Sequence, residues 1–156
     1  MTTTIPTNHI TEPTFVITEE IRVQASMEDT FESLLAQMGR LNETPDGKPF
    51  PMLIEPHPGG RWYRDLGGND GHLWGFVQSI KRPSLLEIWG PVFLSTAASS
   101  NLLYRLTEQD GVTTIRFTHT FVGPVPDPVR ATTHSGWAAL HARVKRAAEA
   151  RAGARR

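Results

Sequence analysis

Hydrophobic residues recur at every second position over residues 15–24, which is the pattern of a strand with one buried face. Glu19 is the one polar residue that interrupts this apolar face. Over residues 27–38 the interval lengthens to three and four positions, which predicts an amphipathic helix. Ser26 followed by Asp29 is typical of a helix start, because a serine oxygen can accept a hydrogen bond from the third backbone N–H that follows it.

Six short apolar runs come after a proline-rich loop, and glycine and proline turns separate nearly all of them. Tight turns join antiparallel neighbours, whereas parallel neighbours need a longer crossover. We therefore expect a meander of antiparallel strands. The predicted strands span residues 52–57, 61–66, 72–81, 85–90, 101–108 and 112–121.

A second helix is predicted from Pro128 to about Ala150, with Asp127 as its N-cap. At 1.5 Å per residue it spans about 35 Å, the width of a small domain. A helix of this length must lie across a sheet to bury Trp137. The expected fold class is therefore α+β in the order β-α-β6-α, with a seven-stranded curved antiparallel sheet wrapped around the long C-terminal helix.

The composition fits one domain, since the chain has 156 residues with 16 Lys and Arg balanced by 16 Asp and Glu. We expect a flexible N-terminal arm at 1–13, a single domain at 14–151 and a basic tail at 152–156. A neutral chain has no overall attraction to nucleic acid. The basic residues concentrate after His141, where we read a solvated helix end, with a tail for an acidic partner as the alternative.

Several classes of protein are excluded by what the sequence lacks. The absence of cysteine rules out disulfides and thiolate metal sites. No apolar run approaches the ~20 residues of a membrane span, so no membrane insertion is expected. The first residues lack the basic start and apolar stretch of a signal peptide, and a cytoplasmic protein is the expectation.

Four tryptophans lie in elements that can face the gap between a curved sheet and its helix. Large flat side chains can hold such a gap open as a cavity. Plain packing in the core is an equally good interpretation, because alternation alone does not decide which face each strand buries. The tryptophans are Trp62, Trp74, Trp89 and Trp137.

Five short motifs occur in an order that is specific for one fold. They lie in residues 58–78, 82–91, 113–123 and 135–144, and include Gly59-Gly60 and Gly136-Trp137. With this order the chain resembles the SRPBCC superfamily, which includes START proteins and birch-pollen allergens. Within it the chain is similar to the bacterial branch related to the C-terminal domain of the activator of heat-shock-protein-90 ATPase. The resemblance covers about residues 15–150 and implies a helix-grip fold.

The resemblance also implies an apolar cavity between sheet and C-terminal helix that takes a small hydrophobic or aromatic molecule. Residues on elements that can face this cavity are the candidates for ligand binding. They are Trp62, Arg64, Trp74, Phe76, Trp89, Tyr104, Phe117, His119, His134, Trp137 and His141.

His119 is the candidate catalytic residue, because it shares the apolar face of its strand with Phe117 and Phe121. A buried neutral histidine suits a general base, since burial lowers its pKa. The more frequent role of such a histidine is structural, with its nitrogens bonded inside the core.

Neither a metal nor a cofactor is expected. His134 and His141 are seven residues apart on the last helix, about 10.5 Å, which is too far to share one metal ion. Arg64 could anchor a ligand carboxylate or phosphate, and its alternative is a pair with Glu55 or Glu87 across the sheet.

The first functional hypothesis is binding of a small hydrophobic or aromatic ligand. The second is an enzyme on the same cavity, of the cyclase, dehydratase or proton-transfer type, with a buried histidine as base. A third is a co-chaperone-like ATPase activator, which is the weakest because the chain lacks the additional N-terminal domain of the eukaryotic activators. Assembly as a homodimer is also open.

Overall fold

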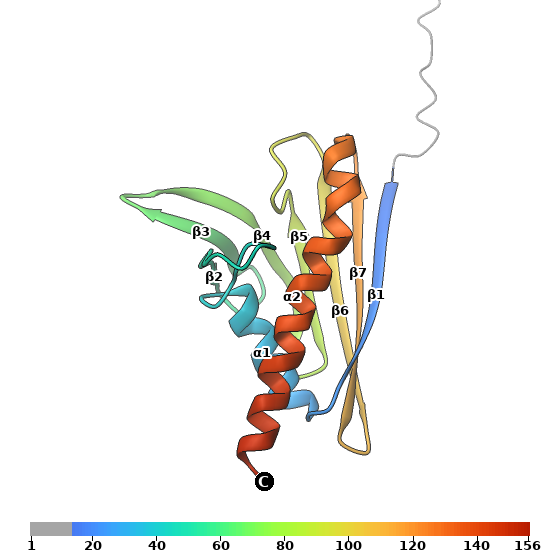
Figure 1. The fold of residues 1–156 in the computed structure, drawn as a ribbon. Coiled ribbons are helices and arrows are strands. Elements are labelled where there is room, and N and C mark those ends of the chain that lie inside the picture. The colour runs from blue at the N-terminus through green and yellow to red at the C-terminus, as the bar shows by residue number, and fades with distance from the viewer. Residues whose placement is uncertain (1–13) are drawn as a thin grey trace, which may run out of the picture.

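The computed structural model describes residues 14–156, so the predicted flexible arm at 1–13 lies outside the described residues. Two helices and seven strands follow one another in the expected order (Figure 1). The elements are β1 (Thr14–Val23), α1 (Met27–Met38), β2 (Leu53–Ile54), β3 (Arg61–Gly67), β4 (Asp70–Lys81), β5 (Leu85–Gly90), β6 (Ser99–Gln109), β7 (Val112–Val122) and α2 (Asp127–Ala154).

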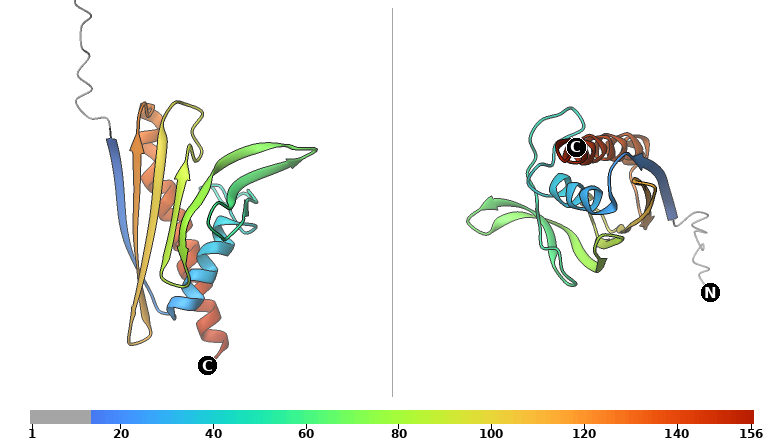
Figure 2. Two further views of the ribbon diagram at one scale, coloured as in Figure 1. Left: turned by 180° about the vertical axis from the view of Figure 1, so that it is seen from behind. Right: turned by 90° about the horizontal axis from the view of Figure 1, so that it is seen from below.

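All seven strands form one antiparallel sheet in the order β1-β7-β6-β5-β4-β3-β2. Strands β2 to β7 form a meander, and β1 pairs with β7 at one edge of the sheet. Figure 2 shows the sheet curving around both helices, with α1 and α2 side by side in its hollow. The predicted α+β class and helix-grip arrangement are confirmed.

The helix ends follow the local sequence in part. The Ser26 hydroxyl accepts from the backbone N–H of Asp29 at 3.1 Å, as the capping pattern predicts. The predicted cap of α2 is wrong, because Pro126 occupies the N-cap without a side-chain bond and Asp127 lies in the first turn. A proline has no hydroxyl or carboxylate to cap with, so the first N–H groups of α2 are left to other partners.

Helix α2 also continues beyond the predicted end, to Ala154. Part of the predicted basic tail is therefore helical. Arg155 donates from Nη1 to Oδ2 of the buried Asp29 at 2.7 Å, which attaches this end of α2 to the first turn of α1. Strand β2 is shorter than predicted, because prolines flank it and cannot donate ladder hydrogen bonds.

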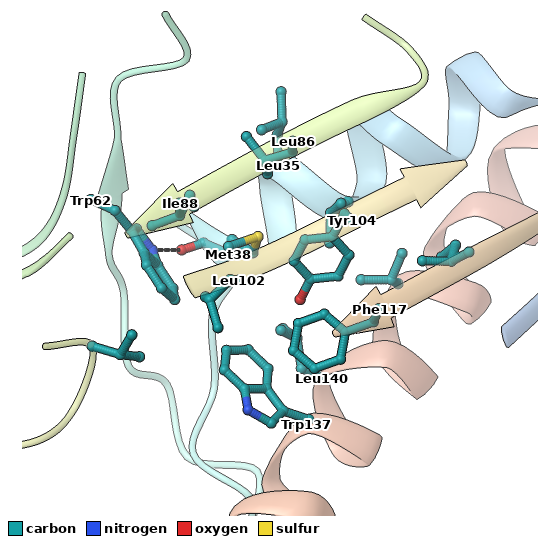
Figure 3. Packing of buried hydrophobic residues seen from close by; sticks show 14 of the residues in the cluster. Leu35, Met38, Trp62, Leu86, Ile88, Leu102, Tyr104, Phe117, Trp137 and Leu140 are labelled. Carbon is teal, nitrogen blue, oxygen red and sulfur yellow. Dashed lines mark hydrogen bonds between the residues drawn. The ribbon is translucent and has the colours of Figure 1, made fainter. Parts of the chain in front are cut away.

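The core lies between the concave face of the sheet and the two helices. Figure 3 shows Trp62 donating from its indole N–H to the backbone oxygen of Met38 at 2.8 Å, which joins β3 to the end of α1. The Phe117 ring packs between two other rings of the core. Its centroid is 4.6 Å from that of Tyr104 and 4.9 Å from that of Trp137. Within residues 14–156, neither helix combines the length and the apolarity that a membrane crossing requires.

Candidate ligand-binding cavity

A cavity of about 560 Å³ lies between the first two-thirds of α2 and the β3–β4 side of the sheet. Its other walls are the loop 42–50 after α1 and the segment that follows β5. The lining residues are Asn42, Glu43, Thr44, Pro45, Phe50, Trp62, Trp74, Phe93, Val129, Thr132, Thr133, Ser135, Gly136, Trp137, Leu140 and Arg143.

Aromatic rings form most of the apolar wall. The Trp62 and Trp74 rings meet edge to face with centroids 5.0 Å apart. Phe93 continues the wall, 5.9 Å from Trp74 and 6.5 Å from Trp137. Phe50 closes the side towards the loop, 6.0 Å from Trp74. The surface offered to a guest is therefore flat and rigid as well as apolar, because aromatic rings have few rotamers.

Trp74 reaches this wall because the strand pairing is irregular at its position. The register passes from Trp62 opposite Gly75 to Tyr63 opposite Leu73, which leaves Trp74 as the extra residue of a β-bulge. A bulge changes the direction in which a side chain points. Strict alternation along β4 would not place Trp74 beside Trp62.

The charged residues of the lining are Glu43 and Arg143. Nε of Arg143 donates to Oε1 of Gln37 at 3.3 Å, and its Nη2 donates to the backbone oxygen of Glu43 at 3.3 Å. The Glu43 carboxylate is 3.8 Å from Nε. Burial lowers the pKa of Arg143 from its ordinary value, although the Glu43 charge opposes that change.

His119 is fully buried beside the cavity but does not line it. The Trp137 indole donates to its Nδ1 at 2.9 Å. An indole N–H is only a donor, so Nδ1 carries no proton and Nε2–H points to the Ser100 hydroxyl at 2.8 Å. Burial lowers the pKa of His119 to about 3, so the ring is neutral. Both nitrogens are engaged, which is the geometry of a residue that holds Trp137 in place.

His141 belongs to a second buried polar group. Its Nε2 is 3.0 Å from the Tyr104 hydroxyl, and its Nδ1 is 3.2 Å from Oε2 of Glu19. Burial and the Glu19 charge raise the pKa of Tyr104 well above its usual value, so the phenol stays protonated. The polar residue that interrupts the apolar face of β1 thus faces His141 on α2.

Arg64 lies behind the cavity wall. Its guanidinium stacks over the Phe50 ring at 3.8 Å, and its buried Nη1 has no hydrogen-bond partner among residues 14–156. The predicted pairing with Glu55 or Glu87 is wrong within the described chain, because Glu55 binds Arg61 at 2.8 Å and Arg64 takes part in no ion pair. Stacking on Phe50 instead places its charge next to the cavity.

The other candidate residues lie away from the cavity. Phe76 and Trp89 pair across the outer face of the sheet with centroids 5.6 Å apart, and Trp89 is 48% exposed. On β5 the positions next to Trp89 point into the core, so Trp89 points out. His134 is exposed on α2, and Phe117 is buried in the core. Of the predicted set, Trp62, Trp74 and Trp137 line the cavity.

Most of the lining residues are not among the candidates, and Phe50, Phe93 and Arg143 are the most informative of those missed. Phe50 and Phe93 lie in irregular segments, where periodicity carries no information about facing. Arg143 belongs to the basic stretch for which the sequence predicts a solvated helix end. Arg143 follows Leu140 by three positions, which places it near the buried stripe of α2. This spacing is the sequence feature that could have identified it. Among residues 14–156, no three histidine, aspartate or glutamate side chains are grouped so as to hold a metal ion.

The comparisons with known proteins agree on the fold. No protein-family model matches the sequence, and no curated protein sequence matches it. The solved structure of Ara h 8.0201 is similar with a TM-score of 0.63 and 15% identity, over 85% of this chain and 95% of that one. The Aha1 dimer from Colwellia psychrerythraea has a TM-score of 0.63 and 17% identity, over 86% of this chain and 96% of that one.

A third similar structure is protein CV1439 from Chromobacterium violaceum, with a TM-score of 0.66 and 13% identity, over 86% of this chain and 97% of that one. Identities this low show a shared fold and nothing about a shared activity. These likenesses confirm the helix-grip fold that the SRPBCC resemblance implied.

Proposed function

We propose that this chain binds a small hydrophobic, ring-containing molecule in the cavity between α2 and the β3–β4 side of the sheet. The observation that supports it best is a cavity of about 560 Å³ with five aromatic residues in its lining. Pockets for small molecules typically enclose about 300–1,000 Å³ and have apolar walls with few polar groups. Binding would be driven by the apolar area removed from water, at roughly 25 cal/mol per Å².

Gly136 offers a direct test, because it lines the cavity from the middle of α2. A Cβ at this position would have Pro45 Cγ as its nearest neighbour, at 3.9 Å. Gly136→Ala therefore fits without a clash and should stabilise the helix by roughly 1 kcal/mol. Gly136→Leu should add the same helix propensity and also fill part of the cavity.

The measurement is a fluorescence titration with N-phenyl-1-naphthylamine, a neutral aromatic probe that brightens in apolar surroundings. We expect saturable binding to the wild type, a dissociation constant within about twofold for Gly136→Ala, and binding at least about tenfold weaker for Gly136→Leu. Equal binding by all three proteins would place the probe elsewhere. Absence of saturable binding by the wild type would contradict the proposed function.

Two other hypotheses have less support. Catalysis with His119 as base would need a free ring nitrogen near the guest, whereas both nitrogens are bonded inside the core. For an ATPase activator, the similarity to the Aha1 structure shows the fold alone. That structure is a dimer, and a homodimer of the present chain stays a prediction.

A further inference from the structure

The cation of the mainly apolar cavity, Arg143, is poorly compensated. Arg143 lines the cavity with its side chain 12% exposed, whereas the Glu43 side chain near it is 39% exposed. A buried cation usually has close partners, because removal from water is costly unless charge and hydrogen bonds replace the lost solvent.

The partners of Arg143 are distant for such a role. Charge-assisted hydrogen bonds from arginine are typically about 2.7–2.9 Å long. The bonds of Arg143 to Gln37 and to the Glu43 backbone are both 3.3 Å, and the Glu43 carboxylate is 3.8 Å away. These contacts use Nε and Nη2, and Nη1 takes part in none of them. Arg146 adds a second positive charge close by, which disfavours the charged form of Arg143.

We propose that the guest of the cavity is an aromatic carboxylic acid, whose rings lie between Trp62 and Trp137 and whose carboxylate binds the guanidinium of Arg143. This inference rests on the proposed function, since it concerns the same cavity. A planar carboxylate matches the arginine fork, which can donate two parallel hydrogen bonds. It would supply close acceptors that Gln37 and Glu43 do not. The single charge of a carboxylate also suits a site with Glu43 nearby better than the double charge of a phosphate does.

The test compares three probes with one ring system and different charge. These are 2-naphthoate, the neutral 2-naphthamide and the cationic 2-naphthylmethylamine, titrated calorimetrically at pH 7 and low salt. We expect 2-naphthoate to bind about tenfold more tightly than 2-naphthamide, which corresponds to one charge-assisted hydrogen bond. The cationic probe should bind most weakly.

Variants assign the preference to a residue. Arg143→Gln should bring 2-naphthoate to the affinity of 2-naphthamide and leave the amide within about twofold of its wild-type value. Arg146→Gln is the matched control, because it removes the same charge from an exposed position of the same helix. It should retain most of the preference. Glu43→Gln should tighten 2-naphthoate several-fold, because the competing carboxylate is gone.

The outcomes separate the two proposals. Equal binding of 2-naphthoate and 2-naphthamide by the wild type would overturn the inference and leave the proposed function standing. Tighter binding of the amine would also overturn it and would identify Glu43 as the anchor. If none of the probes binds, the proposed function fails together with the inference. If Arg143→Gln does not fold, Glu43→Gln decides: tighter 2-naphthoate supports the inference, and unchanged or weaker binding overturns it.

Discussion

His119 is held neutral by its surroundings, and this has a consequence for stability. Its pKa is lowered to about 3 in the folded protein by burial, compared with 6.5 for an ordinary histidine. Between these values the unfolded chain binds a proton that the folded protein does not bind. The free energy of unfolding must therefore fall as the pH decreases from about 6.5 towards 3.

We expect His119 to account for about 2 kcal/mol of the stability lost between pH 7 and pH 5. His119→Gln removes the titrating ring and keeps an amide donor and acceptor for Ser100 and Trp137. Urea unfolding at both pH values should show a smaller loss for this variant than for the wild type. Equal losses would mean that the pKa of His119 in the folded protein is not lowered.

The hydrogen bond between the Tyr104 hydroxyl and His141 can also be tested by a single substitution. Tyr104→Phe preserves the ring that packs on Phe117 at 4.6 Å and removes the partner of His141 Nε2. A buried polar atom left without its partner costs roughly 1–2 kcal/mol of stability. We expect a loss of this size by urea unfolding.

Tyr63→Phe is the matched control. Its hydroxyl takes part in no hydrogen bond within residues 14–156, so the change should stay within about 0.5 kcal/mol. Similar effects of the two substitutions would show that the bond to His141 contributes nothing to stability.

At the scale of elements, β4 and β5 approach unusually closely at Gly75 and Gly90. A Cβ at Gly75 would lie 2.6 Å from the Trp89 backbone oxygen and 2.9 Å from Cγ2 of Ile88. Gly90 has a φ of 152° and lies against the Gly75 backbone. Beyond this close contact between β4 and β5, the β3–β4 hairpin turns away from α2, as Figure 1 shows. The glycines therefore sit where the sheet opens towards the cavity.

Gly75→Ala should lower the free energy of unfolding by roughly 1–3 kcal/mol, because backbone atoms cannot move aside as a flexible side chain can. Thermal and urea unfolding measure the change. The control is Gly153→Ala, where no atom lies within 4 Å of the added Cβ and the site is helical. That variant should be neutral or slightly stabilised, and a Gly75→Ala protein as stable as the control would contradict the close approach.

At the scale of the whole molecule, α2 has two different environments. Its second half packs on α1, which fills the hollow of the sheet with side chains such as Phe31, Leu34 and Met38. Among residues 14–156 no second helix accompanies the first half, and the loop 42–50 closes that side. Figure 2 shows α1 beside one end of α2. The cavity lies where the helix pair ends, so the short length of α1 leaves the space that a ligand could occupy.

The sequence by itself determined the elements and their order, including helix α1 to the residue and six of the seven strands closely. These depend on local causes: the interval between apolar residues, the turn residues between strands, and the serine cap at Ser26. The antiparallel meander followed from the short connections. Even Glu19 was recognisable as an exception on an apolar face, although its partner was not.

The tertiary structure alone decided which side chains meet. Trp74 faces the cavity because of a bulge, Trp89 points outward because of the register of β5, and Phe50 and Phe93 arrive from irregular segments. Arg143 is partly buried because loop 42–50 folds back onto α2. Such contacts join residues far apart along the chain, and periodicity reports only on neighbours. A pattern can therefore predict that a sheet grips a helix, but the packed structure is needed to find the space left between them.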